Sequence, residues 1–146
     1  MTLPINNTSS EDDYKYRKTL NEDVKLKSDE YGFFDLDMDN GDYINVTGLD
    51  SLLNACIIAI MTRAGELVDN PTYNEFGCQA HELPKQNQNR LFLFKLEAYI
   101  NDTLTKMRRV RSVDRISVTR TDIHDYQVEF DITSINDEII KGSVVL

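Results

Sequence analysis

Hydrophobic residues recur with the period of an α-helix between Leu49 and Met61. They stand at positions i, i+3, i+4, i+7, i+8, i+11 and i+12, which places them on one wide face of a helix. The residues are Leu49, Leu52, Leu53, Cys56, Ile57, Ile60 and Met61. Thr47 is the expected N-cap, with Asp50 completing an imperfect capping box, and Gly65 lies beyond the helix as a stop signal. The pattern predicts an amphipathic helix over residues 49–61.

A second helical stripe runs from Leu91 to Met107. Its apolar positions are Leu93, Leu96, Ile100, Leu104 and Met107, widened by Phe92 and Tyr99. The last turn is expected to be basic, from Lys106 to Arg109, where cations complement the helix dipole. Residues 66–87 lie between the two helices and contain two prolines, a glycine and many amides, which predicts a loop.

The last part of the chain alternates apolar and polar residues with the period of two that is typical of β-strands. The apolar positions are Ile116 and Val118, then Tyr126, Val128, Phe130 and Ile132, then a run through residues 139–146. Turn residues at 121–125 and 134–137 separate the runs, so three strands are predicted. We expect an α+β fold in which the two amphipathic helices pack on a mainly antiparallel sheet. The last strand could pair at its edge with a strand from a neighbouring subunit.

An N-terminal β-hairpin is predicted over residues 34–46, where apolar residues alternate with aspartates and other polar residues. A three-residue loop at residues 39–41, with its glycine in the left-handed region, would place Leu36 opposite Ile44 and bring both apolar sets to one face. A two-residue Asn-Gly loop would instead place Leu36 opposite Asn45. The hydrophobic register therefore favours the longer loop.

The chain divides into residues 1–30, which are polar and charged, and residues 31–146. We expect the first segment to be an extended N-terminal arm that gains structure against a partner, and the second to be a single domain. The composition, 40% hydrophobic and 28% charged, is that of a soluble protein. No apolar run approaches the roughly 20 residues of a membrane span, and no secretory signal is recognised. We therefore expect a cytosolic chain with Cys56 and Cys78 reduced.

Charge is unevenly distributed along the chain. The net charge of −9 argues against sequence-independent binding of nucleic acid, because contacts with phosphates need a basic surface. Basic residues crowd one short region, while residues 1–50 are strongly acidic. The members of the basic region are Lys106, Arg108, Arg109, Arg111, Arg115 and Arg120. This asymmetry fits contact with an oppositely charged partner or with another copy of the chain, and equally fits a solvated surface.

The run "DLDMDNGDY" has acidic residues at every second position, as in a calcium-binding loop. Such a loop needs Gly at position six and Glu at position twelve. Counted from Asp35, these positions hold Asn40 and Val46, so the aspartates fit the outer face of the hairpin better, and a calcium-binding interaction module remains an alternative. Cys78 and His81 supply two of the about four ligands that zinc needs. No metal site is predicted.

Catalytic motifs are absent from the sequence: there is no phosphate-binding glycine loop, nucleophile elbow or pair of histidines at helical spacing. Carboxylate pairs for glycoside hydrolysis cannot be recognised by spacing, because their separation is through space. Glu66 could act as a general acid if burial raised its pKa. Its alternative role is structural, either pairing with Arg63 or closing the helix end. We expect no enzymatic activity and no cofactor.

The segment "GLDSLLNACIIAIMTRAGELVDNPTYNEFGC" resembles the small baseplate wedge subunit family of tailed bacteriophages. Relatives of this family occur in contractile injection machines such as type VI secretion systems and have been called lysozyme-like. The matching positions are Gly48, Thr62, Arg63, Gly65, Glu66, Pro71, Phe76, Gly77 and Cys78. A second helix, a basic junction and a β-rich C-terminal part follow in the family's order. The resemblance covers approximately residues 35–146.

Two departures from the family pattern stand out. Family members usually place proline directly before the aromatic-glycine pair, whereas "TYNE" intervenes here between Pro71 and Phe76. They also often carry Glu-Pro-Arg after the second helix, where this chain has "MRRV" from Met107 to Val110 and keeps only a basic residue. The Glu-Pro pair of the relatives is therefore absent from this segment.

The resemblance implies a structural, non-enzymatic protein of the virion, located in the tail baseplate and assembled in the host cytoplasm. Its partners would be the larger wedge proteins and, in contractile tails, the first ring of sheath, in a multi-copy assembly without nucleic acid or membrane. We expect an interface loop shaped by family-motif residues and an electrostatic contact with an acidic neighbour. The loop residues are Thr62, Arg63, Gly65, Glu66, Pro71, Phe76 and Gly77, and the electrostatic residues are Arg108, Arg109 and Arg111. A peptidoglycan glycosidase is the alternative that the lysozyme-like label implies.

Overall fold

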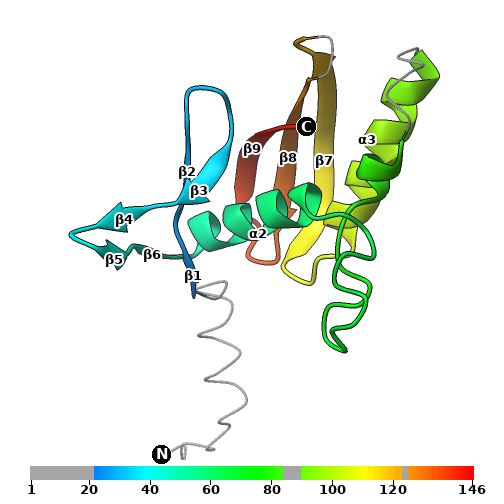
Figure 1. The fold of residues 1–146 in the computed structure, drawn as a ribbon. Helices are drawn as coiled ribbons and strands as arrows, with labels where there is room; N and C mark the ends of the chain where they lie inside the picture. The colour runs from blue at the N-terminus through cyan, green and yellow to red at the C-terminus, as the bar shows by residue number, and fades with distance from the viewer. Residues whose placement is uncertain (1–21, 84–89, 123–124) are drawn as a thin grey trace, which may run out of the picture.

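A computed structural model describes residues 22–83, 90–122 and 125–146 of the chain. Its main sheet is antiparallel, with the strand order β7-β8-β9. The strands are β7 (Val110–Arg120), β8 (Tyr126–Ser134) and β9 (Ile139–Val145). Two helices, α2 (Leu49–Met61) and α3 (Arg90–Thr105), pack on the sheet (Figure 1). The predicted α+β class is confirmed, and α2 has the predicted bounds.

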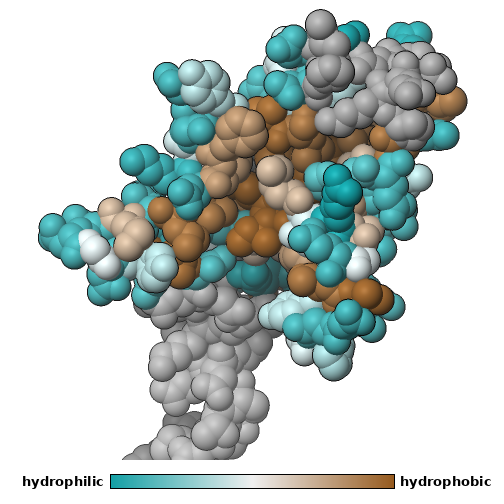
Figure 2. Space-filling view, viewed as in Figure 1, coloured by the Kyte–Doolittle hydropathy of each residue, from teal (hydrophilic) through white to brown (hydrophobic). Residues whose placement is uncertain are grey.

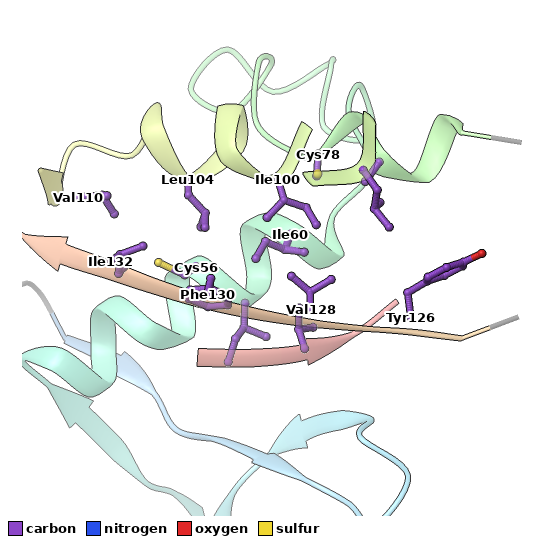
Figure 3. Close-up of a cluster of buried hydrophobic side chains, with 14 of the residues drawn as sticks. Cys56, Ile60, Cys78, Ile100, Leu104, Val110, Tyr126, Val128, Phe130 and Ile132 are labelled. Atoms are coloured by element: carbon purple, nitrogen blue, oxygen red, sulfur yellow. The ribbon is translucent and has the colours of Figure 1, made fainter. Parts of the chain in front are cut away.

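The hydrophobic core lies between one face of the sheet and the two helices. Strand β8 is central, and its period-two alternation turns Tyr126, Val128, Phe130 and Ile132 toward the helices, where all four are buried (Figure 3). Helix α2 contributes Leu52, Cys56, Ile57 and Ile60, and α3 contributes Phe92, Leu96, Ile100 and Leu104. The apolar faces predicted for the two helices therefore pack on the apolar face of the sheet. No helix in the described ranges is long and apolar enough to cross a membrane.

Strand β7 reaches the core through two β-bulges. Its register with β8 shifts between Val110 and Ser112 and again between Val113 and Arg115. Each shift adds one residue, so the core-facing positions of β7 are spaced by three residues, from Val110 to Val113 to Ile116, before normal alternation resumes. The irregular spacing explains why sequence alternation identified only the second half of this strand.

Glycine is required at one crossing of the sheet and α2. Gly142 in β9 lies directly opposite Phe130 in β8. A Cβ atom built on Gly142 would stand 2.3 Å from Phe130 Cζ and 2.7 Å from Leu53 Cδ1. The absent side chain leaves the room that the Phe130 ring and Leu53 of α2 fill.

The N-terminal part of the described chain consists of short antiparallel strands. β1 (Glu22–Val24) pairs with β6 (Asn45–Thr47), β2 (Leu26–Ser28) with β3 (Phe34–Leu36), and β4 (Met38–Asp39) with β5 (Asp42–Tyr43). Residues 22–28, assigned from the sequence to the arm, are thus strands held by partners later in the chain. Residues 1–21 lie outside the described residues.

The predicted register of the hairpin is wrong. Met38 lies opposite Tyr43 and Asp39 opposite Asp42, so the loop contains only Asn40 and Gly41. Both loop residues have positive φ, 51° and 80°, as the tight turn that suits twisted strands requires. The three-residue loop was favoured because it aligned two apolar sets on one buried face. Here the tip of the hairpin is exposed, and Leu36 pairs with Leu26 of β2 instead of Ile44.

The predicted helix ends also need correction. Thr47 belongs to β6, where it pairs with Glu22, and Gly48 is the N-cap with φ 65° and no side-chain capping bond. The C-terminal end of α2 is as predicted, with Thr62 as the C-cap and Gly65 beyond it. Helix α3 ends at Thr105, so Lys106, Arg108 and Arg109 follow the helix instead of forming its last turn. The pairing of Thr47 with Glu22 and the early end of α3 therefore override the local signals.

Replacing Asn54 with alanine is expected to release β1 from α2. The buried Asn54 side chain donates a hydrogen bond from Nδ2 to the carbonyl oxygen of Val24 at 2.7 Å. Loss of this donor should destabilise the contact between β1 and α2 by about 1–3 kcal/mol. Hydrogen exchange should become faster at the β1 and β6 amides and stay unchanged in α3. Asn101→Ala, at an exposed position of α3, is the control, and equal exchange at β1 in both variants would contradict the expectation.

Candidate functional site

The segment that follows α2 is held in a compact turn by Thr62, Arg63 and Glu66. Thr62 Oγ1 donates to the carbonyl oxygen of Ile58 at 2.7 Å. The backbone N–H of Arg63 donates to Glu66 Oε2, and the N–H of Glu66 donates to the carbonyl oxygen of Arg63, both at 3.1 Å. Glu66 is exposed. The carboxylate and the backbone N–H of Glu66 therefore both bond to the backbone of Arg63 and stabilise the turn.

The loop from Gly65 to Phe76 is a series of tight turns. Pro71 occupies the second position of the turn from Asn70 to Tyr73, closed by a 3.1 Å bond between the Tyr73 N–H and the Asn70 carbonyl oxygen. Proline is favoured there because its fixed φ suits the turn. The rings of Tyr73 and Phe76 meet edge to face, 6.0 Å between centroids. These contacts give the loop a definite shape.

Gly77 fastens this loop to the end of α2. It has φ 120°, and a Cβ atom there would stand 2.5 Å from the carbonyl oxygen of Arg63. The close approach allows a parallel bridge, in which the Cys78 N–H donates to the Thr62 carbonyl oxygen at 2.8 Å and the Ala64 N–H donates to that of Cys78 at 3.2 Å. Only glycine fits both the conformation and the space.

A groove of about 720 Å³ runs between this loop and the basic junction that links α3 to β7. One wall is residues 72–77 and the other is residues 106–109, with Ala59 and Thr103 also lining the groove. The groove brings together two pairs of predicted residues that are far apart in sequence, Phe76 with Gly77 and Arg108 with Arg109. Lys106 reaches Asp102 at 2.9 Å, and this bond raises the pKa of Lys106, with Glu75 adding a smaller effect.

The two departures from the family pattern form the two walls of the groove. The inserted "TYNE" segment contributes Thr72 to Glu75, and the "MRRV" segment contributes Met107 to Arg109. Sequence reasoning did not select Tyr73, Lys106 or Met107 as site residues. The insertion itself contained a signal for Tyr73, because an aromatic residue between two turn signals is expected to be exposed on the surface.

The remaining predicted residues lie elsewhere. Thr62 and Glu66 line a shallow apolar hollow of about 340 Å³ between α2 and the β2-β3 loop, together with Phe33, Ile58 and Met61. Figure 2 shows hydrophobic residues gathered over the middle of the molecule, in the region of α2 and β3, bordered by hydrophilic ones. Arg111 pairs with Asp137 in the β8-β9 turn and donates from a second guanidinium nitrogen to the Ile135 carbonyl oxygen at 3.1 Å.

The candidate metal ligands do not converge. Within residues 22–83, 90–122 and 125–146, no group of three or more His, Cys, Asp or Glu side chains could hold a metal ion. In the hairpin, Asp37 forms an ion pair with Lys25 at 3.2 Å. Cys78 is buried as a free thiol, and His81 Nε2 lies 2.8 Å from the carbonyl oxygen of Ile60. Both residues of the Cys-x-x-His step therefore contribute to packing around the end of α2.

Alkaline pH is expected to destabilise the protein partly through Cys56. Burial raises the pKa of this thiol from 9.0 to about 12, although Arg109 acts in the opposite direction. The unfolded chain loses this proton near pH 9 and the folded chain keeps it. The stabilising contribution is thus complete below about pH 9 and is lost as the pH rises toward 12. In urea titrations over this range, Cys56→Ala should lose stability less steeply than the wild type; parallel curves would contradict this.

The described residues define an α+β protein with two helices on a three-stranded antiparallel sheet and an open groove beside the helix junction. No family model and no curated protein matches the chain. Among solved structures, the fold is similar to the crystal structure of a "putative tail lysozyme" from Geobacter sulfurreducens, with a TM-score of 0.58 and 14% sequence identity. The similarity covers 66% of this chain and 86% of that chain. At this identity the similarity establishes a shared fold.

Proposed function

We propose that the protein is a structural component of a phage tail baseplate wedge and binds larger wedge proteins. The observation that carries the proposal is the fold shared with the "putative tail lysozyme" over 86% of that chain. The order of the motif residues along the sequence between Gly48 and Cys78, which resembles the small wedge subunit family, gives independent support. The proposed location is the tail baseplate of the virion, after assembly in the host cytoplasm.

The groove beside the basic junction fits a protein partner. Tyr73 on its wall is 51% exposed, and Arg108 and Lys106 are also exposed. Tyrosine and arginine are the residues that most often dominate protein interfaces, where an aromatic ring supplies contact area and a guanidinium supplies directed bonds. A second contact is proposed at β9, which pairs on one side only, with β8, among the described strands and could accept a strand from tail sheath.

The proposal of a non-enzymatic role is supported by the surroundings of the available carboxylates. Glycoside hydrolysis uses two carboxyl groups flanking one bond. Among the described residues that line the groove, Glu75 alone carries a carboxylate. Glu66 lines a different hollow and accepts a hydrogen bond from the Arg63 N–H. This arrangement offers a structural use for Glu66 and no partner carboxylate in either hollow.

Binding to a large wedge protein from the same phage tests the proposal. The two proteins are co-expressed and the complex is isolated at about 0.1 M and about 1 M salt, where Debye lengths are about 10 and 3 Å. We expect a complex that weakens at high salt, and weakens further with Arg108→Glu. Lys95→Glu, the same charge change on the exposed side of α3, serves as the control. No complex at either salt concentration would contradict the proposal.

The second candidate is a peptidoglycan glycosidase, favoured by the word "lysozyme" in the name of the structural neighbour. Purified protein and its Glu66→Ala variant are added to a cell-wall suspension and turbidity is followed. The structural proposal predicts no clearing by either protein. Clearing by the wild type that is lost in Glu66→Ala would establish the enzyme and overturn the structural role.

A further inference from the structure

The β4-β5 hairpin projects from the molecule and displays an apolar pair at its tip (Figure 1). Met38 and Tyr43 lie directly opposite each other, so their side chains share one face of the hairpin. They are 52% and 54% exposed. A methionine and a tyrosine held side by side in solvent form a compact apolar surface at the end of a narrow projection.

The hairpin is also acidic in an arrangement that is unfavourable when isolated. Asp39 faces Asp42 across the two strands, and like charges directly opposite each other destabilise a strand pair. Residues 28–62 contain seven carboxylates and no lysine, arginine or histidine. Asp37 is paired with Lys25, which comes from outside this span. A cationic surface placed against the tip would relieve the repulsion between Asp39 and Asp42.

The groove beside the basic junction has the complementary properties. Its walls carry Arg108, Arg109 and Lys106, the last already paired with Asp102, against a single carboxylate, Glu75, among the described lining residues. The aromatic rings of Tyr73 and Phe76 line the same groove. Its volume of about 720 Å³ lies within the range of about 300–1,000 Å³ that accommodates a drug-sized group, so it can receive two side chains. The tip therefore offers an apolar surface to the aromatic rings of the groove, and its carboxylates have the opposite charge to the basic side chains of the groove.

We propose that the hairpin tip of one copy of the protein docks in the groove of a second copy. Met38 and Tyr43 would contact Tyr73 and Phe76, and Asp39 and Asp42 would face the basic wall. Figure 1 shows the hairpin and the loop at residues 66–78 on opposite sides of the molecule, so a chain does not fill its own groove. Each copy uses two different surfaces, and the contact is head to tail. This inference goes beyond the proposed function and does not depend on it, and because both use the same groove, a wedge protein bound there would compete with the hairpin tip.

Self-association of the full chain tests the inference by sedimentation velocity. The contact is small, so we expect a dissociation constant between about 1 μM and 1 mM, with sedimentation coefficients that rise with protein concentration. Raising salt from about 0.1 M to about 1 M should weaken association at least tenfold because it screens the exposed charges. A wild-type protein that remains monomeric up to about 1 mM at low salt would overturn the inference. This holds even if the groove is found to bind another protein.

Two variants separate the surfaces. The hairpin variant combines Asp39→Lys with Tyr43→Ser, and the groove variant combines Arg108→Glu with Tyr73→Ala. Each should weaken self-association at least tenfold while circular dichroism stays unchanged, because all four side chains are exposed. The matched controls are Asp125→Lys and Lys95→Glu, which reverse the same charges at exposed positions outside tip and groove and should associate like the wild type. Wild-type association in either double variant would overturn the inference.

A mixture of the two variants distinguishes a head-to-tail contact from a symmetric one. The hairpin variant keeps an intact groove, and the groove variant keeps an intact tip. Their equimolar mixture should form a heterodimer that grows no further, because each complex has only one intact contact. A mixture that stays monomeric, or one that forms larger assemblies, would overturn the head-to-tail arrangement.

Discussion

Replacing Phe130 with alanine is expected to lower the free energy of unfolding by about 3–5 kcal/mol. Phe130 is 0% exposed in the central strand and lies opposite Gly142. Alanine would remove the ring without supplying a replacement, since the position that faces the ring on β9 has no side chain. Domains of this kind have total stabilities of about 5–15 kcal/mol, so the loss would be a large share of the whole.

Urea unfolding followed by circular dichroism measures this loss. Phe94→Ala is a matched control because Phe94 is 69% exposed on α3, and it should change stability by no more than about 0.5 kcal/mol. If Phe130→Ala does not fold, Phe130→Leu keeps the test available with a smaller deficit. Equal stabilities for Phe130→Ala and Phe94→Ala would contradict the position of Phe130 in the core.

Replacing Gly77 with alanine should have the second largest effect, a loss of about 1–3 kcal/mol from its positive φ with steric repulsion in addition. A new Cβ atom would stand 2.5 Å from the Arg63 carbonyl oxygen and 2.9 Å from the Ala64 nitrogen. These are backbone atoms, which cannot rotate away as the end of a side chain can. The bridge between Arg63 and Cys78 would therefore open, and the loop wall of the groove would shift.

Gly65→Ala isolates the steric part of this effect. Gly65 also has a positive φ, 81°, but a Cβ atom there meets nothing within 4 Å. Alanine at Gly65 should therefore cost only the conformational strain, about 1–2 kcal/mol. Thermal unfolding of the two variants side by side should place Gly77→Ala clearly below Gly65→Ala. The reverse order would show that Gly77 does not hold the loop against α2.

Periodic segments were predictable from the sequence because their pattern is local and repeated. The apolar stripe of α2 extends over thirteen residues, and the alternation of β8 continues through Ile132 without a break. β7 was only half recognised, since its bulges change the spacing of core positions to three residues. Short strands such as β1 carry too few residues for a period, and their pairing depends on partners more than twenty residues away.

The candidate residues were found in part, but their arrangement was not. Phe76 and Arg108 belong to separate loops, and nothing in either segment indicates that both border one groove. Tyr73 was noticed only as part of an insertion. The hairpin register failed for a different reason, because burial of the whole apolar face was assumed, whereas Leu36 and Met38 are exposed. Local periodicity determines elements, whereas a groove depends on how loops from distant segments meet.

The bulges of β7 also make the two edges of the sheet different. They interrupt the even spacing of backbone groups on one outer strand, while β9 at the other edge keeps a regular register with β8. Irregular edges resist the addition of a further strand, and regular ones accept it. We therefore expect any strand-wise growth of this sheet to proceed from β9 alone, so that an assembly built in this way would be polar.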